Sequence, residues 1–461
     1  MSDSVRTADV CVVGAGVSGL FAADNLRKAG LTVDVYEAQS HVGGRVKDTV
    51  CHEDVTVELG ANWFSEQQPL IKAQIERFGI ETKRTHNDGE HLIWWNDQRS
   101  AFKGILPSLG PIVNSDIIQG MARFERIMAK LQNQEPWDEQ FVEYDHMSFG
   151  QWIDKTLFTT SGKQFFRMVS EMVFGVESHM VSFLYVLYYS NRSVSLSSLI
   201  SVDKGHQELR FTHGPRQLCD HLAASIGAEN ILLNTPVRAI KVADGMVTVD
   251  AGHVSGRYRS VLCAMPPPAV KQVIFSPPRD TARERLLQAL PMGRVIKVQA
   301  VYEKPYWLEL GLSGQVMSNH YPLSYTIDNS PTDNQSGVLA AFVGTSHAKA
   351  FMAEGVDREK LVADAIDDMF GNKFPKPQKV LIEDWAQNEW IGGSYGAYFP
   401  PGVMSRMGHV LREHEPPIYW CGAEYAQTHP CQIEGALESG LRAAKQITEA
   451  LLAWDRSVAQ L

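Results

Sequence analysis

The stretch ADVCVVGAGVSGLFAADNLRKAGLTVDVYEA, residues 8–38, decides the fold of this chain. It begins with a short, continuously apolar run, which is typical of a parallel strand buried on both faces. The loop Gly14-x-Gly16-x-x-Gly19 follows, and after it come apolar residues at helical spacing. A second strand pattern then ends in Glu37. The stretch therefore predicts a βαβ unit with a glycine-rich loop between its first strand and its helix.

Each glycine of this loop has a physical reason to be a glycine. Gly14 permits the tight turn, Gly16 lets the backbone approach a pyrophosphate, and Gly19 lets the helix pack on the strand. The N-terminus of the helix adds unpaired N–H groups and a positive dipole, which favour phosphate. Glu37 stands where an acid accepts both ribose hydroxyls of an adenosine. These residues are therefore predicted to bind a dinucleotide.

Two segments just beyond the second strand extend the predicted site. Gly44 and Arg45 belong to the segment VGGRV, and Arg45 can supply positive charge to the pyrophosphate. An arginine in this place can equally be a surface residue. Gly60, in ELGANWF, offers a second close approach of the backbone to the ligand.

The C-terminal part of the chain repeats the pattern of a strand end followed by a helix start. Gly422 and Glu424 follow the strand pattern IYWC, and Ile433 opens a long helix pattern. The N-terminus of this helix can stabilise negative charge on a bound group. Glu434 can also be no more than a favourable acid in a first helical turn.

Similar strand and helix patterns recur in the middle of the chain, and residues 91–204 are aromatic-rich and helix-like. This layout predicts an α/β fold, in which a Rossmann-like dinucleotide-binding domain is built from discontinuous segments. A second domain is inserted between these segments; a family resemblance described below implies that it is α+β, with a mixed sheet and helices. The expected segments are 1–84, 206–284 and 386–461 for the first domain, and 85–205 and 285–385 for the second.

The composition is that of an ordinary globular protein, with 461 residues, 44% hydrophobic and 21% charged. A net charge of −10 argues against nucleic acid or an anionic membrane as the main partner, and mildly favours cations such as protonated amines. The six cysteines lack CxxC spacing, so neither disulfides nor a metal site are predicted. We expect a cytoplasmic protein without signal peptide or membrane anchor, because no apolar run reaches about 18 residues.

Lys297 lies in GRVIKVQAVYE, which has the pattern of a strand. Alternation places Lys297 on the same face as Val295, Gln299 and Val301. A lysine on a strand usually faces solvent. If apolar neighbours bury it instead, desolvation lowers its pKa and makes it a functional candidate. Both alternatives are open from the residues alone.

Four blocks occur in order along the chain: VVGAGVSGLFAADNLRKAGLTVDVYEAQSHVGGR, MGRVIKVQAVYEKPYW, WAQNEWIGGSYGAYFPPG and IYWCGAEYAQTHPCQIEGALESGLRAA. Together they resemble the flavin-containing amine oxidases, which include monoamine, polyamine, putrescine, nicotine and L-amino-acid oxidases. The resemblance runs over nearly the whole chain. It implies an FAD-dependent enzyme that oxidises an amine to an imine, hydrolysed to an aldehyde or ketone, while O₂ is reduced to H₂O₂. It also implies a homodimer, the usual form in the family.

The resemblance assigns roles to individual residues. Lys297 matches the lysine that holds a water against flavin N5, and Tyr395 matches one of two tyrosines in front of the flavin. Gln432 stands where the second tyrosine is found. The predicted catalytic residues are Lys297, Tyr395 and Gln432, and the predicted substrate-binding residues are Trp63, Gln207, Tyr395 and Gln432. The predicted cofactor-binding residues are Gly14, Gly16, Ser18, Gly19, Glu37, Ala38, Gly44, Arg45, Gly60, Ala61, Asn62, Trp63, Val237, Trp385, Gly422, Glu424, Gln432 and Ile433.

One departure concerns how the flavin is held. Ser394 occupies the position of the cysteine that is covalently linked to the flavin in mammalian monoamine oxidases. A serine cannot form that thioether, so we expect non-covalent FAD.

The substrate class stays open. A diamine or polyamine enzyme would need acidic residues along its entry, and an L-amino-acid oxidase would need an arginine, for which Arg192 is a candidate. A cyclic amine is a further alternative, as is a dehydrogenase that passes electrons to another protein.

Overall fold

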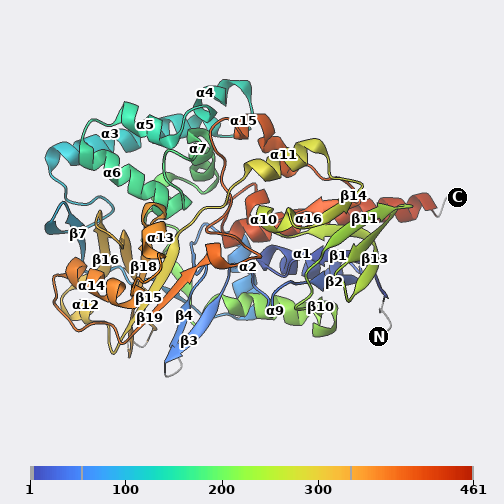
Figure 1. The fold of residues 1–461 in the computed structure, drawn as a ribbon, viewed down its shortest axis with the longest axis horizontal. Helices are drawn as coiled ribbons and strands as arrows, with labels where there is room; N and C mark the ends of the chain where they lie inside the picture. The colour runs from blue at the N-terminus through green and yellow to red at the C-terminus, as the bar shows by residue number, and fades with distance from the viewer. Residues whose placement is uncertain (1–4, 53–54, 333–334, 459–461) are drawn as a thin grey trace.

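The structure is a computed structural model that describes residues 5–52, 55–332 and 335–458. Two large sheets lie toward opposite ends of an elongated molecule, and a layer of helices covers one side of the second sheet (Figure 1). Both sheets carry helices, so the fold is mixed α/β, as the sequence predicts.

The first sheet contains the predicted βαβ unit. β1 pairs in parallel with both β2 and β13, and the connection from β1 to β2 is the helix α1. The strand order is β10-β2-β1-β13-β12-β11-β14, with β20 paired to β13. Its strands are β1 (Val5–Val13), β2 (Val33–Tyr36), β10 (Ile231–Leu232), β11 (Ala239–Ala243), β12 (Met246–Asp250), β13 (Ser255–Cys263), β14 (Ile274–Ser276) and β20 (Ile418–Trp420).

Helices from distant parts of the chain pack around α1. It contacts both α9 and α16, so the N-terminal, middle and C-terminal segments share one hydrophobic core. The helices of this half are α1 (Val17–Lys28), α2 (Pro69–Phe78), α9 (Arg216–Ile226), η4 (Ala228–Asn230), α10 (Pro267–Val270), α11 (Thr281–Ala289), η7 (Ala423–Tyr425) and α16 (Ile433–Val458).

The second sheet has the order β19-β15-β18-β17-β16-β7-β8. It is mixed, because β16 pairs in parallel with β7 while its other neighbours are antiparallel. Its strands are β7 (Glu90–Trp95), β8 (Gln98–Phe102), β15 (Ile296–Tyr302), β16 (Leu312–Ser318), β17 (Tyr325–Asp328), β18 (Gly337–Val343) and β19 (Lys379–Asp384). The helices α12 (Tyr306–Glu309), α13 (Thr345–Phe351), α14 (Arg358–Phe370) and η5 (Trp385–Gln387) accompany it.

β7 and β8 correct one expectation, because they lie within the part of the chain that we expected to be helix-like. Along β7 exposed or half-exposed residues alternate with buried ones, which is the period of a strand. The aromatic content of this short segment concealed the alternation, since short apolar runs do not separate strand from helix.

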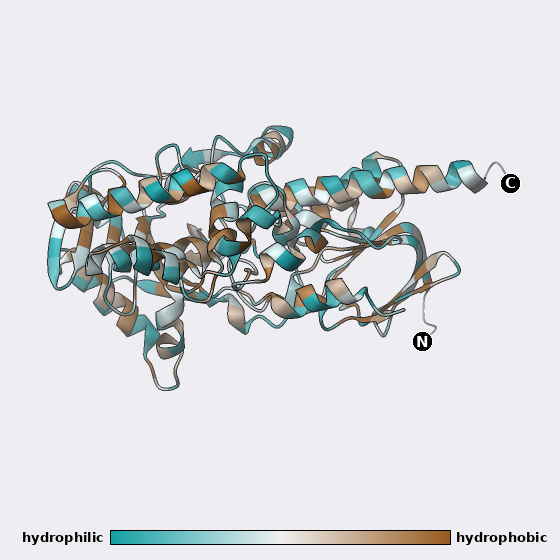
Figure 2. Cartoon of the chain, turned by 90° about the horizontal axis from the view of Figure 1, so that it is seen from above, coloured by the Kyte–Doolittle hydropathy of each residue, from teal (hydrophilic) through white to brown (hydrophobic). Residues whose placement is uncertain are grey.

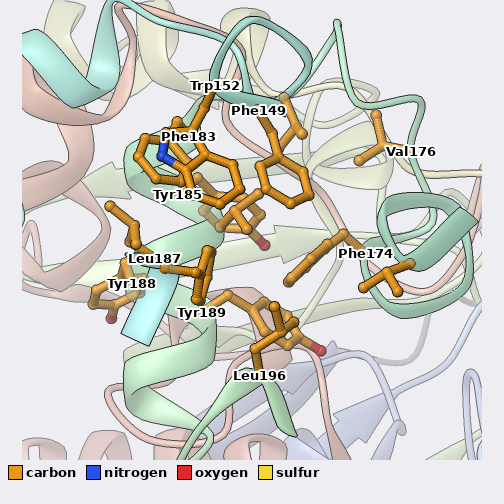
Figure 3. Packing of buried hydrophobic residues seen from close by; sticks show 14 of the residues in the cluster. Phe149, Trp152, Phe174, Val176, Phe183, Tyr185, Leu187, Tyr188, Tyr189 and Leu196 are labelled. Atoms are coloured by element: carbon orange, nitrogen blue, oxygen red, sulfur yellow. The ribbon is translucent and has the colours of Figure 1, made fainter. Parts of the chain in front are cut away.

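The helical layer holds an aromatic core. Phe149, Trp152 and Phe183 lie against one another, with the Trp152 and Phe183 ring centroids 4.9 Å apart (Figure 3). The core fixes the helices that stand next to the functional site. The elements of this layer are α3 (Pro111–Met128), η1 (Ala129–Leu131), η2 (Glu139–Phe141), α4 (Val142–Asp145), α5 (Phe149–Thr156), α6 (Thr160–Val169), the π-helical turn η3 (Ser170–Phe174), α7 (Phe183–Arg192), α8 (Leu196–Leu199), α15 (Met404–Met407) and η6 (Gly408–Arg412).

Short strands join the two halves. β3 and β4 form an antiparallel pair, and β9 lies between β5 and β6 in a small three-stranded sheet. Their bounds are β3 (Asp48–His52), β4 (Val55–Glu58), β5 (Trp63–Phe64), β6 (Thr82–Arg84) and β9 (Leu209–Phe211). The division into two domains at the expected boundaries stays a prediction.

Hydrophilic and hydrophobic residues alternate along the helices at the surface, as amphipathic helices require (Figure 2). Within the described residues no helix combines the length and the apolar character that crossing a bilayer demands.

Candidate active site

The glycine-rich loop leaves the N-terminus of α1 open. Gly16 is the N-cap of α1, no side chain caps the helix, and its first turn holds no acid. A Cβ on Gly16 would meet nothing within 4 Å, whereas a Cβ on Gly19 would lie 2.0 Å from the carbonyl oxygen of Gly14. Gly14 has a φ of 109°, which favours glycine. Gly16 therefore faces open space and Gly19 is a packing position.

A cavity of about 380 Å³ begins at this loop and reaches between the two sheets. It brings together all but one of the predicted site residues; the exception is Gly19, which lies beneath the loop. The predicted residues that line it are Gly14, Gly16, Ser18, Glu37, Ala38, Gly44, Arg45, Gly60, Ala61, Asn62, Trp63, Gln207, Val237, Lys297, Trp385, Tyr395, Gly422, Glu424, Gln432 and Ile433.

Glu37 lies at the end of β2 and is 5% exposed. Its carboxylate accepts hydrogen bonds from the backbone N–H groups of Ala15 (2.7 Å) and Gln39 (2.9 Å). Burial raises the pKa of Glu37, although these backbone hydrogen bonds oppose the rise. The Glu37 carbonyl also accepts from the N–H of Thr235 at 2.7 Å, which holds the loop containing Val237 beside the carboxylate.

Arg45 joins the N-terminal and C-terminal parts of the site. Its guanidinium donates to both carboxylate oxygens of Glu424, at 2.6 and 2.9 Å, and to the carbonyl of Tyr395 at 2.7 Å. Burial opposes the charge on Glu424, but the charge and hydrogen bonds of Arg45 outweigh it and lower the pKa of this carboxyl. The alternative that Arg45 is a surface residue is therefore wrong. The contact with Tyr395 couples this ion pair to the position of the tyrosine backbone.

Lys297 is buried, with 6% of its surface exposed. Its ammonium donates to the carbonyl of Gly60 at 2.8 Å and to Oδ1 of Asn62 at 2.9 Å. It also lies 4.8 Å from the centroid of the Trp63 ring. Burial lowers the pKa of Lys297 to about 8, against the opposing effect of Glu58. The structure thus decides between the two alternatives for this strand lysine.

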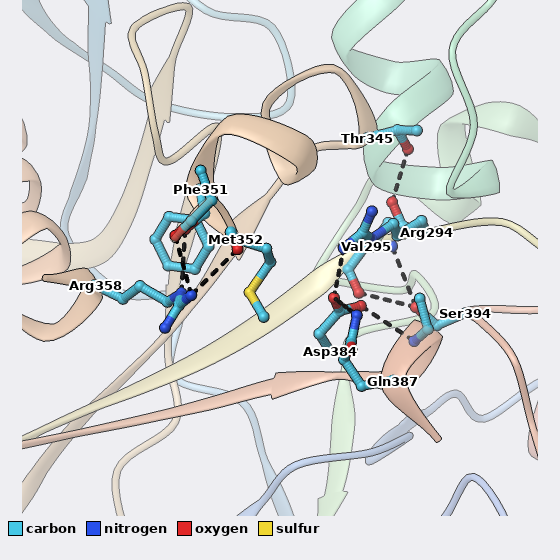
Figure 4. Close-up of polar contacts among 11 residues, drawn as sticks. Arg294, Val295, Thr345, Phe351, Met352, Arg358, Asp384, Gln387 and Ser394 are labelled. Carbon is cyan, nitrogen blue, oxygen red and sulfur yellow. Dashed lines mark hydrogen bonds and ion pairs between the residues drawn. The ribbon is translucent and has the colours of Figure 1, made fainter. Parts of the chain in front are cut away.

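Ser394 is anchored to the start of β15. Its hydroxyl donates to the carbonyl of Val295 at 2.9 Å and accepts from the N–H of Val295 at 3.2 Å (Figure 4). Arg294, which precedes Val295, forms an ion pair with Asp384, with its guanidinium nitrogen 2.7 Å from Oδ2. The peptide bond between Ser394 and Tyr395 is cis. These contacts fix the backbone on which Tyr395 stands.

The amide of Gln432 is already engaged by protein groups. Its oxygen accepts from Nε2 of Gln68 at 2.8 Å and lies 2.9 Å from Nδ1 of His206. Its nitrogen donates to the hydroxyl of Ser193 at 3.0 Å. These contacts therefore fix the orientation of the Gln432 side chain where it lines the cavity.

Glu434 has a structural role, which agrees with the simpler alternative that it does not bind a ligand. Its carboxylate accepts from the N–H groups of Leu70 (2.9 Å) and Ile71 (2.8 Å), in the first turn of α2. This carboxylate therefore satisfies a helix N-terminus away from the cavity.

An apolar wall closes the cavity next to Tyr395 and Trp63. Tyr395 and Trp63 pack against a cluster that includes Ile327 and Phe342. Sequence reasoning missed this wall, because its residues come from several separate helices and strands and form no motif. The wall consists of Phe165, Met168, Val169, Met172, Val173, Tyr189, Leu199, Ile200, Met317, Tyr325, Ile327 and Phe342.

None of the residues of the wall carries a charged side chain. Among the described residues that line it, the only carboxylates are Glu37 and Glu424, and the only guanidiniums are those of Arg45 and Arg238. Arg238 follows Val237 in the loop beside Glu37. Within the same described set Arg192 is not part of the lining; its guanidinium donates to the carbonyl of Gln134 at 3.1 Å.

No group of three or more histidine, cysteine, aspartate or glutamate side chains in the described part of the chain could hold a metal ion.

A cavity that combines an uncapped helix N-terminus behind a glycine-rich loop with an apolar chamber, the part lined by the apolar wall, is typical of a dinucleotide-binding enzyme. Residues 17–448 match the family model "Flavin containing amine oxidoreductase", and the chain belongs to that family.

Several known proteins are similar to this chain over nearly its whole length. Amine oxidase [flavin-containing] B of Sus scrofa is 31% identical over 453 residues, which are 96% of this chain and 86% of that protein. The structure of wild-type putrescine oxidase bound to putrescine has a TM-score of 0.92 and 27% identity, covering 96% of this chain and 99% of that one. Cyclohexylamine oxidase from Brevibacterium oxydans IH-35A has a TM-score of 0.90 and 26% identity, with the same coverage.

The family implies a flavin, and the residues present fit FAD. The open N-terminus of α1 and the bare Gly16 leave room for a pyrophosphate beside unpaired N–H groups. The Glu37 carboxylate has lone pairs beyond the two that its backbone donors use, so it can accept ribose hydroxyls.

Proposed function

We propose that this protein is an FAD-dependent oxidase of apolar monoamines. The observation that carries the proposal is the apolar wall beside Tyr395 and Trp63, in a cavity whose two carboxylates are both already engaged by protein donors. Family membership supports amine oxidation, and the wall selects the class of amine.

The wall favours an amine with one nitrogen and an alkyl or aryl body. Burying apolar surface stabilises binding by about 25 cal/mol per Å², and the wall offers such surface from four aromatic and eight aliphatic or sulfur-containing side chains. A second ammonium on the substrate would have to enter this chamber without a counter-charge, which costs several kcal/mol. The wall therefore disfavours diamines and polyamines.

The same argument applies to amino acids. A substrate carboxylate needs a cation or several hydrogen-bond donors when it is buried. Arg45 is paired with Glu424, and Arg192 does not line the described cavity. Lys297 is the remaining cation near the wall, and Gly60 and Asn62 already hold two of its three N–H groups.

The chamber also sets the protonation state of the substrate. An ammonium loses its hydration in an apolar site, so the neutral amine is bound more favourably. Neutral amine is also the form that carries a nitrogen lone pair, which oxidation at the adjacent carbon requires. Tyr395 is itself held neutral, because burial raises the pKa of its hydroxyl.

FAD, when bound, supplies the acceptor for the two electrons of the amine and passes them to O₂, which gives H₂O₂. We propose that it is bound without a covalent link, because the Ser394 hydroxyl makes both of its hydrogen bonds to Val295 and has no thiol chemistry to offer. Lys297, with a pKa of about 8, can hold or release a proton at Nζ near neutral pH. Its third N–H is free of the two contacts described and is available to a water or to the product imine.

Anaerobic mixing of the yellow enzyme with 2-phenylethylamine tests the proposal. We expect the flavin absorbance to bleach with this amine, and to return on addition of oxygen with one H₂O₂ formed per flavin. Faster bleaching by putrescine or by L-phenylalanine than by 2-phenylethylamine would contradict the proposed substrate class. Bleaching that is not reversed by oxygen would contradict the oxidase and favour a dehydrogenase.

A further inference from the structure

Lys297 is one end of a chain of buried polar side chains that leads away from the cavity. Its ammonium donates to Oδ1 of Asn62 at 2.9 Å, and Nδ2 of Asn62 donates to Oδ1 of Asn329 at 3.3 Å. Nδ2 of Asn329 then donates to Oε2 of Glu58 at 2.6 Å. The four side chains are 6%, 1%, 3% and 4% exposed, respectively. Such a chain in a protein interior needs every donor matched to an acceptor.

The two ends of the chain fix the orientation of the amides between them. An ammonium has only donors and a carboxylate has only acceptors. Asn62 must therefore turn its oxygen to Lys297, and Asn329 must turn its nitrogen to Glu58. A glutamine at position 58 could still accept from Asn329 through its amide oxygen, but it would supply no negative charge and would place an NH₂ group where the second carboxylate oxygen lies.

Neighbouring groups hold the chain from the side. Gln299, on the same face of β15 as Lys297, donates to the carbonyl of Glu58 at 2.7 Å and accepts from Asn329 at 3.3 Å. Arg210, 2% exposed, donates to Oδ1 of Asn329 and to the carbonyl of Ser330 at 2.8 Å.

Four charged groups act on this buried region. Glu58 and Asp48 favour the ammonium form of Lys297, and Arg210 disfavours it. Asp48 has a pKa raised by burial to about 7, so its own charge varies near neutral pH. Glu58 is the carboxylate that the hydrogen-bonded chain connects to the lysine.

We propose that Glu58 is a positioning residue for Lys297, acting through Asn329 and Asn62. The carboxylate orients both amides and thereby holds the ammonium at the cavity wall beside Gly60. It also supplies the negative charge that allows the ammonium to exist in this buried place. The contribution to catalysis rests on the proposed function, whereas the hold on Lys297 does not.

The test compares pairs of holoenzymes that differ at Lys297, in the presence of a large excess of free FAD. Wild type and Lys297→Met form the first pair, and Glu58→Gln with Glu58→Gln/Lys297→Met forms the second. Urea unfolding midpoints are measured from pH 6 to pH 10. For each pair, the difference between the two midpoints gives the contribution of Lys297, and the readout is the pH at which this difference begins to change. The matched control is Glu383→Gln: Glu383 faces Lys297 across β15 and β19 but pairs with Lys47 at 2.7 Å.

We expect that pH to fall by about one unit in the Glu58→Gln pair, because an opposite charge of this kind favours the charged form by about one unit or more. The Glu383→Gln pair should match wild type. Coincidence of the Glu58→Gln and wild-type pairs would overturn the proposal. If Glu58 had only a structural role, Glu58→Gln would lower the unfolding midpoints at every pH and would leave this pH unchanged.

A second variant keeps the test decisive if Glu58→Gln does not fold. Asn329→Ser removes the link and leaves the carboxylate, and its pair should show a smaller displacement in the same acid-ward direction, because the charge of Glu58 stays and only its hold on the amides is lost. Failure of both variants to fold, with Glu383→Gln folded, would mean that the chain maintains the core and not the lysine, and would overturn the proposal. None of these measurements needs amine turnover, so an error in the proposed substrate class leaves the outcome readable.

Discussion

Replacing Lys297 by methionine removes a buried ammonium and keeps a side chain of similar length. Lys297 is 6% exposed, and burial lowers its pKa from 10.5 to about 8. The gap of about 2.5 pH units corresponds to about 3 kcal/mol, since one unit is about 1.4 kcal/mol. That free energy disfavours the folded wild-type protein at neutral pH.

The sign of the pH dependence follows from the two protonation states. Between about pH 8 and pH 10.5 the lysine of the unfolded chain is still protonated, whereas the buried lysine has lost its proton. The unfolded state therefore binds more protons, and the free energy of unfolding rises with pH in this window. Methionine does not titrate, so the variant lacks this rise.

Urea unfolding of the two holoenzymes at pH 7, 8, 9 and 10 measures the effect. The free energy of unfolding of Lys297→Met, relative to wild type, should fall by about 2 to 3 kcal/mol from pH 7 to pH 10. Lys349→Met, on the exposed side of α13, controls for the loss of a solvent-facing lysine. Parallel profiles for wild type and Lys297→Met would refute the buried, titrating lysine on which the site is built.

Four further outcomes are expected. Acid or heat should release all of the flavin into the supernatant, and yellow colour that stays with the precipitate would contradict non-covalent binding. Gly16→Val should keep the thermal stability of the apoprotein but weaken FAD binding at least tenfold, whereas Gly19→Ala, whose Cβ meets a carbonyl at 2.0 Å, should destabilise the fold itself; equal effects of the two would refute the assignment of the loop. Glu424→Gln leaves the Arg45 guanidinium without its bidentate partner and should lower the free energy of unfolding by about 3 kcal/mol in urea titrations, and a change below about 1 kcal/mol would show that the pair is not buried as described. Gln432→Tyr should raise the ratio of kcat/KM for benzylamine to that for n-butylamine, and an unchanged ratio would remove residue 432 from the substrate side of the cavity.

Sequence reasoning worked where a motif has one physical explanation. The βαβ unit and its loop follow from the buried strand, the three glycines and Glu37, and the structure shows all of them in the expected geometry. The family resemblance then located the other predicted residues, which the fold brings to one cavity from segments up to 400 residues apart.

It failed where the outcome depends on tertiary contacts. Strand alternation placed Lys297 on a face but could not say whether that face is covered, and the loop from Gly60 to Trp63 is what covers it. Glu424, the partner of Arg45, lies 379 residues away in the sequence, so no local pattern predicts the ion pair. The apolar wall is assembled from residues of several elements that are far apart in the sequence, and only the fold brings them to one side of the cavity.

The central claim is that the chamber accepts one amine nitrogen and excludes a second. The most direct measurement is kcat/KM in a peroxide-coupled assay for n-hexylamine and for 1,6-diaminohexane, at one pH and one oxygen concentration. The two molecules differ only in the second amino group. We predict that the monoamine is favoured by about 100-fold or more, because an uncompensated buried ammonium costs about 3 kcal/mol or more. Equal values, or a preference for the diamine, would contradict the account.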